Sequence, residues 1–459
     1  MTTPPPNRDA NAGGLWGHAD FLRLWSAQAI SAFGSRITRT ALPIIAVATL
    51  HQSAVMLGVL GAMQLIPGVV LAMLVGGFVD RSNKRRILVA ADLIRAGLVA
   101  SLTVAWALGA LSSMVHVIVV GAGVGAASAL FQITDVAYLP ALIGRRRLAE
   151  GNAKLETTEA IAEITGPASA GGLIAALGAP VAVAIDAASY LWSAFMLGRI
   201  RTVEPRPRAR PATPRPDADE PVELTVRTTE DFRLGIRAVF GHPLVRPIVQ
   251  CLMVWSIAGG FFMALYTLFC LDELGLSKSA FGVIIAMGGV GSLAGAMLAR
   301  SLSRALGVGR TLLVTSVASL AFGLFIPLAA SGTSRTMTLG FLVAHQLLGD
   351  GFAVAFVILA VTLRQTVLPR ELLGRANAAI HVCTTGVLPV ASLAAGGLAA
   401  MIGLRNAVWV GVLIGLAAPA FLWRLRHLKD MPSAELGASD SGMPRASARD
   451  SLTGEPPAS

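Results

Sequence analysis

Several charged side chains lie within segments that are otherwise apolar, and their types and spacing could support chemistry. Arg36 and Arg39 are about one helical turn apart near the middle of one apolar run. Glu156, Glu159 and Glu163 follow the spacing i, i+3 and i+7 in another, so a helix would place all three on one face. Such carboxylates can bind a proton or a cation. Because an ionisable group inside an apolar helix costs roughly a few kcal/mol unless it is paired or hydrated, each is a candidate functional residue.

The segments that position these charges are long and hydrophobic. Of the 459 residues, 54% are hydrophobic and only 14% are charged. Apolar runs of about 18 residues or more recur along the chain, and each could cross a ~30 Å hydrocarbon layer as a helix. The fold class expected is therefore an all-α integral membrane protein. We predict about twelve transmembrane helices, at residues 22–50, 53–79, 87–109, 113–138, 152–177, 180–198, 247–271, 279–302, 311–331, 337–362, 376–400 and 404–423.

The predicted helices fall into two sets of six that share a sequence repeat. The stretch "LPALIGRRRLAEGNA" at 139–153 follows the fourth helix, and "LPRELLGRANA" at 368–378 follows the tenth. Two related six-helix halves are typical of transporters that bind solute near the membrane midplane. The domains expected are a disordered N-terminus (1–20), an N-terminal half (21–198), a cytoplasmic linker rich in Pro and Arg (199–240), a C-terminal half (241–430) and a disordered tail (431–459).

The distribution of basic residues predicts the orientation of the chain. Lys and Arg concentrate in the even-numbered connections, and such residues are retained on the cytoplasmic side. Both termini are therefore expected in the cytoplasm, with the protein multi-pass in the plasma membrane. The net charge of +11 then reflects topology and attraction to anionic lipid. A nucleic-acid partner is not expected, because the sequence has no polar basic domain.

The connection after the second predicted helix reads "GGFVDRSNKRR" (76–86) and resembles the signature loop of the major facilitator superfamily. That loop has the pattern Gly-x-x-x-Asp-Arg-x-Gly-Arg-Lys/Arg. The matching residues are Gly76, Asp80, Arg81, Lys84 and Arg85. The resemblance covers about residues 20–430 and implies a gating role for these residues.

Two further features of this loop follow from the resemblance. Asn83 stands where the family usually has Gly, and we expect it to preserve the turn because Asn tolerates positive φ. Asp135, near the inner end of the fourth helix, is expected to form a charge relay with Asp80 and Lys84 that holds the outward-facing state.

The fifth predicted helix resembles the Gly-Pro-x-x-Gly-Gly pattern of exporters and antiporters in this superfamily. Gly166 and Pro167 match, whereas Ala170 replaces the first paired glycine. The pattern predicts close approach and sliding of two helices. Ordinary small-residue packing within one half is the alternative. The beginning of the chain, "FLRLWSAQAI", and the stretch "ADLIRA" look most like the branch of macrolide-efflux proteins and the enterobactin exporter.

The first and fifth helices are neighbours in the superfamily fold, so we expect Arg36 or Arg39 to pair with Glu159 or Glu163. The pair could be purely structural, or a substrate cation or proton could compete for the carboxylates and couple binding to motion. Glu156 is expected to be solvated near the inner surface.

Other charges inside the predicted helices receive separate interpretations. Asp350 is a further candidate for substrate or proton coupling, because flanking glycines are expected to open space around it. Asp92 and Arg95, at i and i+3, are expected to form a structural pair. Val119 occupies the position where proton-coupled drug antiporters of the superfamily often carry an arginine.

The function expected is secondary active export of an amphiphilic organic solute, as in antiporters that confer multidrug resistance, with protons as the candidate coupling ion. Uptake by the same fold and a non-transporting receptor or scaffold are the alternatives. We expect no enzyme activity, because the sequence contains no HExxH, GxSxG or Walker motif, and no cofactor or metal. A small-molecule substrate and membrane lipid are the expected partners of a functional monomer.

Overall fold

The computed structural model describes residues 14–75, 78–79, 82–111, 113–144, 147–202 and 229–429, and every regular element in these ranges is a helix. The N-terminal part contains η2 (Leu15–Gly17), α1 (Ala19–Ala48), α2 (Ala54–Leu74), α4 (Lys84–Ala107), α5 (Met114–Ile143), α6 (Leu148–Leu177) and α7 (Ala179–Gly198).

The C-terminal part contains α8 (Thr229–Gly241), α9 (Val245–Leu268), η4 (Phe269–Glu273), α10 (Lys278–Leu306), α11 (Val308–Gly323), α12 (Phe325–Ala329), α13 (Arg335–Ala344), η5 (His345–Gly349), α14 (Asp350–Val367), α15 (Arg370–Thr385), α16 (Val387–Ile402), α17 (Leu404–Leu416) and η6 (Ala418–His427). Of the interruptions, η4 and η5 are π-helical and η6 is a 3₁₀-helix. Pro327, Pro389 and Pro419 lie just after three of the breaks, where a missing N–H weakens a continuous helix.

The prediction of an all-helical chain with membrane-capable helices is confirmed. By length and composition, ten helical segments of the described chain could cross a membrane, and the two parts of α6 would add an eleventh if they form one span despite a 44° bend. Helix α1 lies outside this set, and its arginines, Arg23, Arg36 and Arg39, lower its mean hydropathy.

The last part of the predicted linker (199–240) contains a helix. Residues 229–241 form α8, which packs against α15. Gly235 of α8 makes this contact close, because a Cβ atom there would meet the Arg375 carbonyl. Residues 203–228 of the predicted linker, and the predicted tail 431–459, lie outside the described residues.

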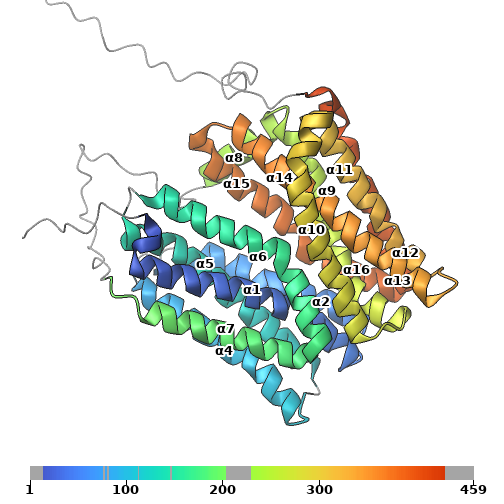
Figure 1. Cartoon of the computed structure of the whole chain (residues 1–459), viewed down its shortest axis with the longest axis horizontal. Helices are drawn as coiled ribbons and strands as arrows, with labels where there is room; N and C mark the ends of the chain where they lie inside the picture. Colours follow the sequence, from blue (N-terminus) through green and yellow to red (C-terminus); the bar gives the residue numbers. More distant parts are fainter. Residues whose placement is uncertain are drawn as a thin grey trace, which may run out of the picture.

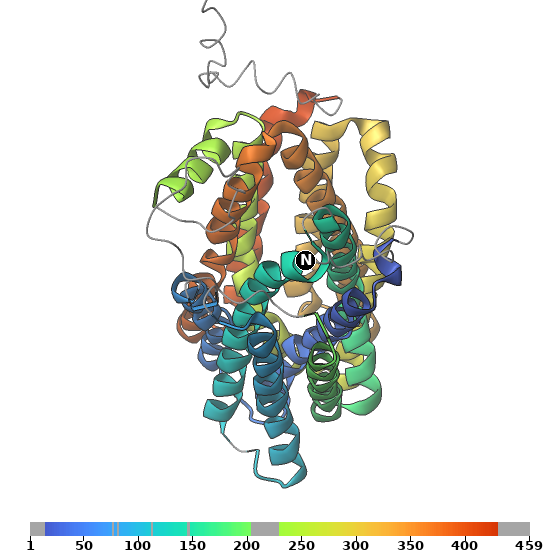
Figure 2. The ribbon, with the colours of Figure 1, turned by 90° about the vertical axis from the view of Figure 1, so that its left-hand side faces the viewer.

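The helices form two bundles that lie side by side (Figures 1 and 2). Helices α1 to α7 make one bundle, and α9 to η6 make the other. The main contacts between them are α6 with α10 and α2 with α16. Both contacts lie toward the end of the molecule where α2 and α10 begin and where α6 and α16 end.

The apolar core shows how the bundles are joined. One cluster of buried side chains contains residues of both bundles, including Ile45, Leu57, Phe281 and Ala395. At the opposite end the core divides into one cluster from the first bundle, around Tyr138, and another from α8 to η6. The bundles therefore share one hydrophobic core at one end and have separate cores at the other.

Small residues permit the contact between α6 and α10. A Cβ atom on Gly171 would collide with the Gly282 carbonyl, and one on Gly289 would collide with Ala168. Backbones at such separation have no room for larger side chains. The expected close approach of the fifth helix is confirmed, and at Ala168 and Gly171 it joins the two bundles.

The local expectation for Asn83 was wrong. Its φ is −73°, in the extended region, and its side chain accepts a hydrogen bond from the Arg86 amide at 2.9 Å. Asn83 is thus the N-cap of α4, a position that Asn favours because it satisfies a free amide of the first turn. No positive φ is needed there.

The contact between α6 and α10 yields a prediction with a matched control. Gly171→Ala should destabilise this arrangement by about 1–3 kcal/mol, the range for overpacking, because the new methyl group meets the backbone of α10. Gly172→Ala adds the same methyl group where nothing lies within 4 Å, so it should leave stability nearly unchanged. Thermal unfolding of the purified chain in detergent measures both. Equal melting temperatures for the two variants would contradict the assignment.

Candidate functional site

The charged residues of α1 and α6 form a cluster centred on Arg36. This residue is 6% exposed near the middle of α1. Its Nη2 atom donates to Glu159 Oε1 at 2.6 Å and also contacts Glu163 Oε2. The predicted pairing between the first and fifth helices is confirmed, and Arg36 bridges two carboxylates one turn apart.

Exposure is very unequal across this cluster. The Arg36 side chain is 7% exposed, whereas the side chains of Glu159 and Glu163 are 58% and 61% exposed. The arginine is thus fixed between helices, but its partners can be reached from outside the protein. A proton or a small cation can bind either carboxylate without first unpacking α1 from α6.

The Gly-Pro pair of α6 shapes the same site. A Cβ atom on Gly166 would lie 2.5 Å from Arg36 Cγ and 3.0 Å from its Cβ, so only glycine leaves room for the arginine stem. Pro167 has no amide hydrogen to donate to the Glu163 carbonyl, which explains why α6 bends between its parts 150–163 and 165–177. Sequence reasoning assigned Gly166 and Pro167 to gating, and the structure places them beside the charge cluster.

The neighbouring charged residues, Arg39 and Glu156, do not take part in these ion pairs. Arg39 is exposed and makes no hydrogen bond or ion pair with another described residue, although it is near enough to Glu163 and Glu159 for their charges to interact. Glu156 is exposed and has no ion pair within the described chain, in agreement with the expected solvated position. Arg36 is therefore the residue that holds the two glutamates.

A second charge pair lies deeper in the same bundle. Arg95 pairs with Asp92, as expected from their spacing, and both are buried. The Arg95 guanidinium also lies between two rings, 4.5 Å from the centroid of Phe131 and 4.4 Å from that of Tyr190. Sequence alone did not indicate these cation–π contacts, because the three residues come from three helices. The enclosure fits a structural pair.

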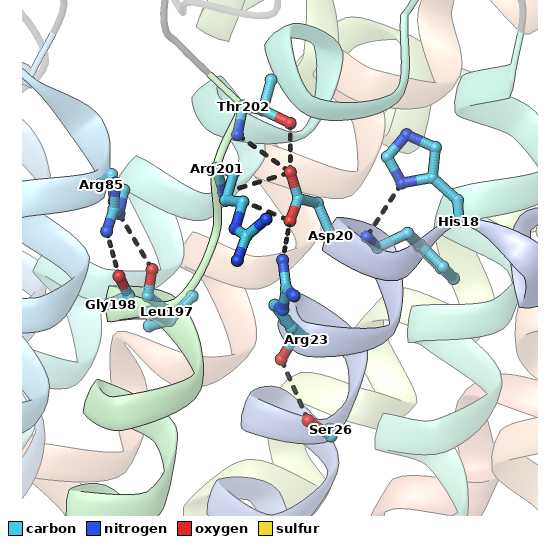
Figure 3. A network of polar contacts seen from close by, with 10 residues as sticks. His18, Asp20, Arg23, Ser26, Arg85, Leu197, Gly198, Arg201 and Thr202 are labelled. Atoms are coloured by element: carbon cyan, nitrogen blue, oxygen red, sulfur yellow. Dashed lines mark hydrogen bonds and ion pairs between the residues drawn. The ribbon is translucent and has the colours of Figure 1, made fainter.

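The signature loop is described only in part. Gly76, Asp80 and Arg81 lie outside the described residues. Lys84 begins α4, and Arg85 donates to the Leu197 carbonyl at 3.0 Å and to the Gly198 carbonyl, at the C-terminus of α7 (Figure 3). A cation there satisfies helix-terminal carbonyls and favours the helix dipole.

Two acidic residues, Asp135 and Asp20, accept hydrogen bonds at the same end of the first bundle as Arg85. Asp135 accepts a hydrogen bond from Gln28 Nε2 at 2.6 Å, a partner that sequence reasoning did not identify. Asp20, at the start of α1, pairs with Arg23 and accepts from the Thr202 amide at 2.9 Å and the Thr202 hydroxyl at 2.6 Å (Figure 3). Asp20 thus ties the beginning of α1 to the chain that leaves α7.

Asp350 lies in the other bundle, and the expected reason for its space was wrong. The flanking glycines do not open space, because a Cβ atom on Gly349 would meet His345 and one on Gly351 would meet the Gly291 carbonyl at 2.9 Å. Room is provided instead by a cavity of about 210 Å³ between α9, α11, α14 and α17, which Asp350 and His345 both line. The structure does not bring Asp350 together with the Arg36 cluster.

Comparison with known proteins gives a family and a fold. The sequence profile described as Major Facilitator Superfamily matches residues 24–387. No match was found among curated proteins. A bacterial homologue of the iron transporter ferroportin in its inward-facing state has a TM-score of 0.64 at 16% identity, over 89% of this chain and 98% of that one.

Two further solved structures are similar. The same ferroportin homologue in its outward-facing state has a TM-score of 0.53 at 16% identity, over 88% of this chain and 99% of that one. The nucleoside transporter NupG has a TM-score of 0.63 at 12% identity, over 89% of this chain and 100% of that one.

The bridge at Arg36 predicts energetic coupling between specific side chains. In a double-mutant cycle, Arg36→Gln and Glu163→Gln should be non-additive by about 0.5–1 kcal/mol, near the lower limit for contacting residues because water screens the exposed carboxylate. Arg39→Gln combined with Glu163→Gln is the matched control and should be closer to additive, since Arg39 makes no ion pair with Glu163. Thermal unfolding of the purified variants gives both coupling energies. Equal coupling in the two cycles would contradict the bridge.

Proposed function

Because the chain belongs to the major facilitator superfamily, we propose that it is a secondary active transporter that exports an amphiphilic organic solute across the plasma membrane by alternating access. The proposal includes twelve spans, with α1 and both parts of α6 crossing the bilayer, and two cytoplasmic termini. The helix order and the pairing of two bundles support this topology.

The conformation described is proposed to be inward-facing. The shared core lies at the end that carries the sparsely charged connections, and the separate cores lie at the end that carries the basic ones. The better agreement with the inward-facing ferroportin homologue than with the outward-facing one supports the same assignment. Export would begin from this state, with the site open to the cytoplasm.

The proposal rests mainly on the bridge from the buried Arg36 side chain to the exposed carboxylates of Glu159 and Glu163. A proton or a cationic group that binds Glu163 neutralises one partner of Arg36, which weakens the contact between α1 and α6. Helix α6 also provides Ala168 and Gly171 at the crossing with α10, so a change at Glu163 is transmitted along one helix to the contact between bundles. Glu159 retains the second contact to Arg36, so the arginine keeps a partner through the cycle.

The remaining predicted residues are proposed to act at the cytoplasmic end. In this conformation Arg85 binds the end of α7 and Asp135 binds Gln28. When the bundles close at this end, we propose that Arg85 and Asp135 leave these partners and form new contacts with the signature loop, which includes Gly76, Asp80, Arg81 and Lys84.

Asp350 is proposed to provide a second carboxylate in the opposite bundle, and Arg39 a second cation near the glutamates.

The substrate class rests on the lining and not on the fold. The ferroportin homologue and NupG are named for iron and nucleosides, so the shared architecture does not select the solute. Apolar and aromatic side chains dominate the cavity beside Asp350, which favours an amphiphile over a sugar. Efflux as a drug antiporter, in the manner of the macrolide and enterobactin exporters, is the specific form proposed.

Transport in energised membranes tests the proposal. Glu163→Gln should reduce energised accumulation of a drug and siderophore panel in inverted vesicles at least tenfold, because the variant cannot exchange a proton at this position. Glu156→Gln is the matched control on the same helix and should transport as the unmodified chain does, since Glu156 makes no ion pair with a described residue. Transport through Glu163→Gln at the unmodified rate would disprove the coupling role.

The same vesicle measurements give the direction of transport and distinguish a transporter from a receptor or scaffold. Accumulation only in right-side-out vesicles would identify uptake. Binding without accumulation in either orientation would identify a receptor or scaffold. Insensitivity to collapse of the proton gradient would exclude protons as the coupling ion.

A further inference from the structure

The cavity beside Asp350 is a compartment of the C-terminal bundle, separate from the Arg36 cluster. It is formed by α9, α11, α12, η5, α14 and α17, and no described residue of the first bundle lines it. Its volume of about 210 Å³ equals that of roughly seven waters at ~30 Å³ each. Pockets that enclose a whole drug-sized ligand are about 300–1,000 Å³, so this cavity fits one group of a larger amphiphile.

The cavity is lined by aromatic and aliphatic side chains around a single carboxylate. Phe262 and Tyr266 are stacked with their centroids 4.2 Å apart, and the His345 ring lies 6.1 Å and 6.2 Å from them. Trp255 stacks against Phe356 at 5.1 Å and supplies another ring. Aromatic faces carry partial negative charge and attract a cation.

Asp350 has no counterion among the residues that the structure describes. Its carboxylate makes no hydrogen bond or ion pair with any residue of the described chain, and one oxygen rests against Gly288 of α10. The Tyr266 hydroxyl is near enough to be affected by the charge of Asp350. An unpaired carboxylate within a membrane helix is costly, and a bound cation would remove that cost.

Tyr266 is a second polar residue of the lining. It is 3% exposed, and its hydroxyl interacts with the Cys270 thiol of η4.

The helices around the cavity are irregular. The π-helix η5 (His345–Gly349) ends immediately before Asp350 and places His345 in the lining. The π-helix η4 begins three residues after Tyr266. Single π-helical turns are less stable than α-helix and occur frequently at functional sites.

We infer that this cavity is a subsite for the cationic, amine-bearing end of a lipophilic substrate, with Asp350 as its counterion and the rings of Phe262 and Tyr266 as its walls. The remainder of the substrate extends beyond the cavity. The inference rests on the proposed function, because it assigns a positive charge to the exported amphiphile. A neutral solute would leave Asp350 unpaired, and an anion would be repelled by it.

Binding of a small probe to the full chain in detergent micelles tests the subsite. The probe is benzyltrimethylammonium, which carries an aromatic ring and a fixed positive charge, and its neutral carbon isostere neopentylbenzene is the matched ligand. Isothermal titration calorimetry, with empty micelles subtracted, should show binding of the cation and at least tenfold weaker binding of the isostere. Equal binding of both would overturn the assignment of Asp350 as a counterion.

Paired variants locate the probe. Asp350→Asn should weaken binding of the cation at least tenfold, whereas Asp350→Glu, which keeps the charge, should bind within a few fold of the unmodified chain. Asp272→Asn removes an exposed carboxylate outside this cavity and should bind normally. A normal affinity in Asp350→Asn would overturn the proposal.

A cavity-filling variant tests the site without changing charge. Gly323 lines the cavity, and its nearest neighbour to a new Cβ atom is Val412 Cγ1 at 3.9 Å, so Gly323→Leu fills the space without a backbone collision. This variant should weaken binding at least tenfold. Gly340→Leu, where nothing lies within 4 Å of a new Cβ atom, is its control and should bind normally. Unchanged binding in Gly323→Leu would place the probe elsewhere.

Failure of the subsite and failure of the transport function give different results. If the probe does not bind, or binds independently of Asp350, while vesicles still show transport that depends on Glu163, the subsite is wrong and the transporter stands. If the probe binds as expected but no vesicle orientation accumulates it or any solute of the panel, the subsite stands and the proposed function is wrong.

Discussion

A buried arginine on α1 must keep a negative partner, and this constraint organises the first bundle. Arg36 obtains two partners from α6, and the glycine at 166 gives its stem room. Loss of both carboxylates would leave an uncompensated charge between two helices, which is more costly than loss of an exposed ion pair. The two glutamates therefore provide redundancy, because either one can hold Arg36 if the other loses its charge.

The same helix carries the contact between the bundles. Pro167 lies between the glutamates and the small residues that meet α10, so the bend of α6 separates a charged part from a packing part. Because Gly171 and Gly282 approach backbone to backbone, the crossing cannot absorb a change in position by adjusting side chains. We therefore propose that a shift of the charged part moves one bundle against the other.

Much of this arrangement follows from sequence, for physical reasons. Apolar length determines the helices, and the energetic cost of intramembrane charge marks Arg36, Arg39, Glu159 and Glu163 as candidates. The resemblance to the superfamily, in which the first and fifth helices are neighbours, then predicts that one of the arginines pairs with one of the glutamates. The N-cap at Asn83 and the bond from Asp135 to Gln28 depend on local dihedral angles and on the rotation of each helix about its axis. Sequence periodicity in a uniformly apolar helix leaves that rotation undetermined.

The cavity at Asp350 shows the same limit more clearly. Its lining comes from six helical elements, and it exists because Gly411 and Gly415 of α17 pack against Phe261 and Ala258 while η5 alters the phase of the helix that carries His345. A single sequence identifies Asp350 as an isolated charge, but it does not place the rings that surround it.

The two bundles present different chemistry. In the first bundle Arg36 binds two exposed carboxylates, whereas in the second Asp350 has no counterion among the described residues. A cation would gain more at Asp350 than at the carboxylates already bound to Arg36, whereas a proton has to compete with Arg36 at those carboxylates. We propose that this difference separates substrate recognition from coupling along the chain.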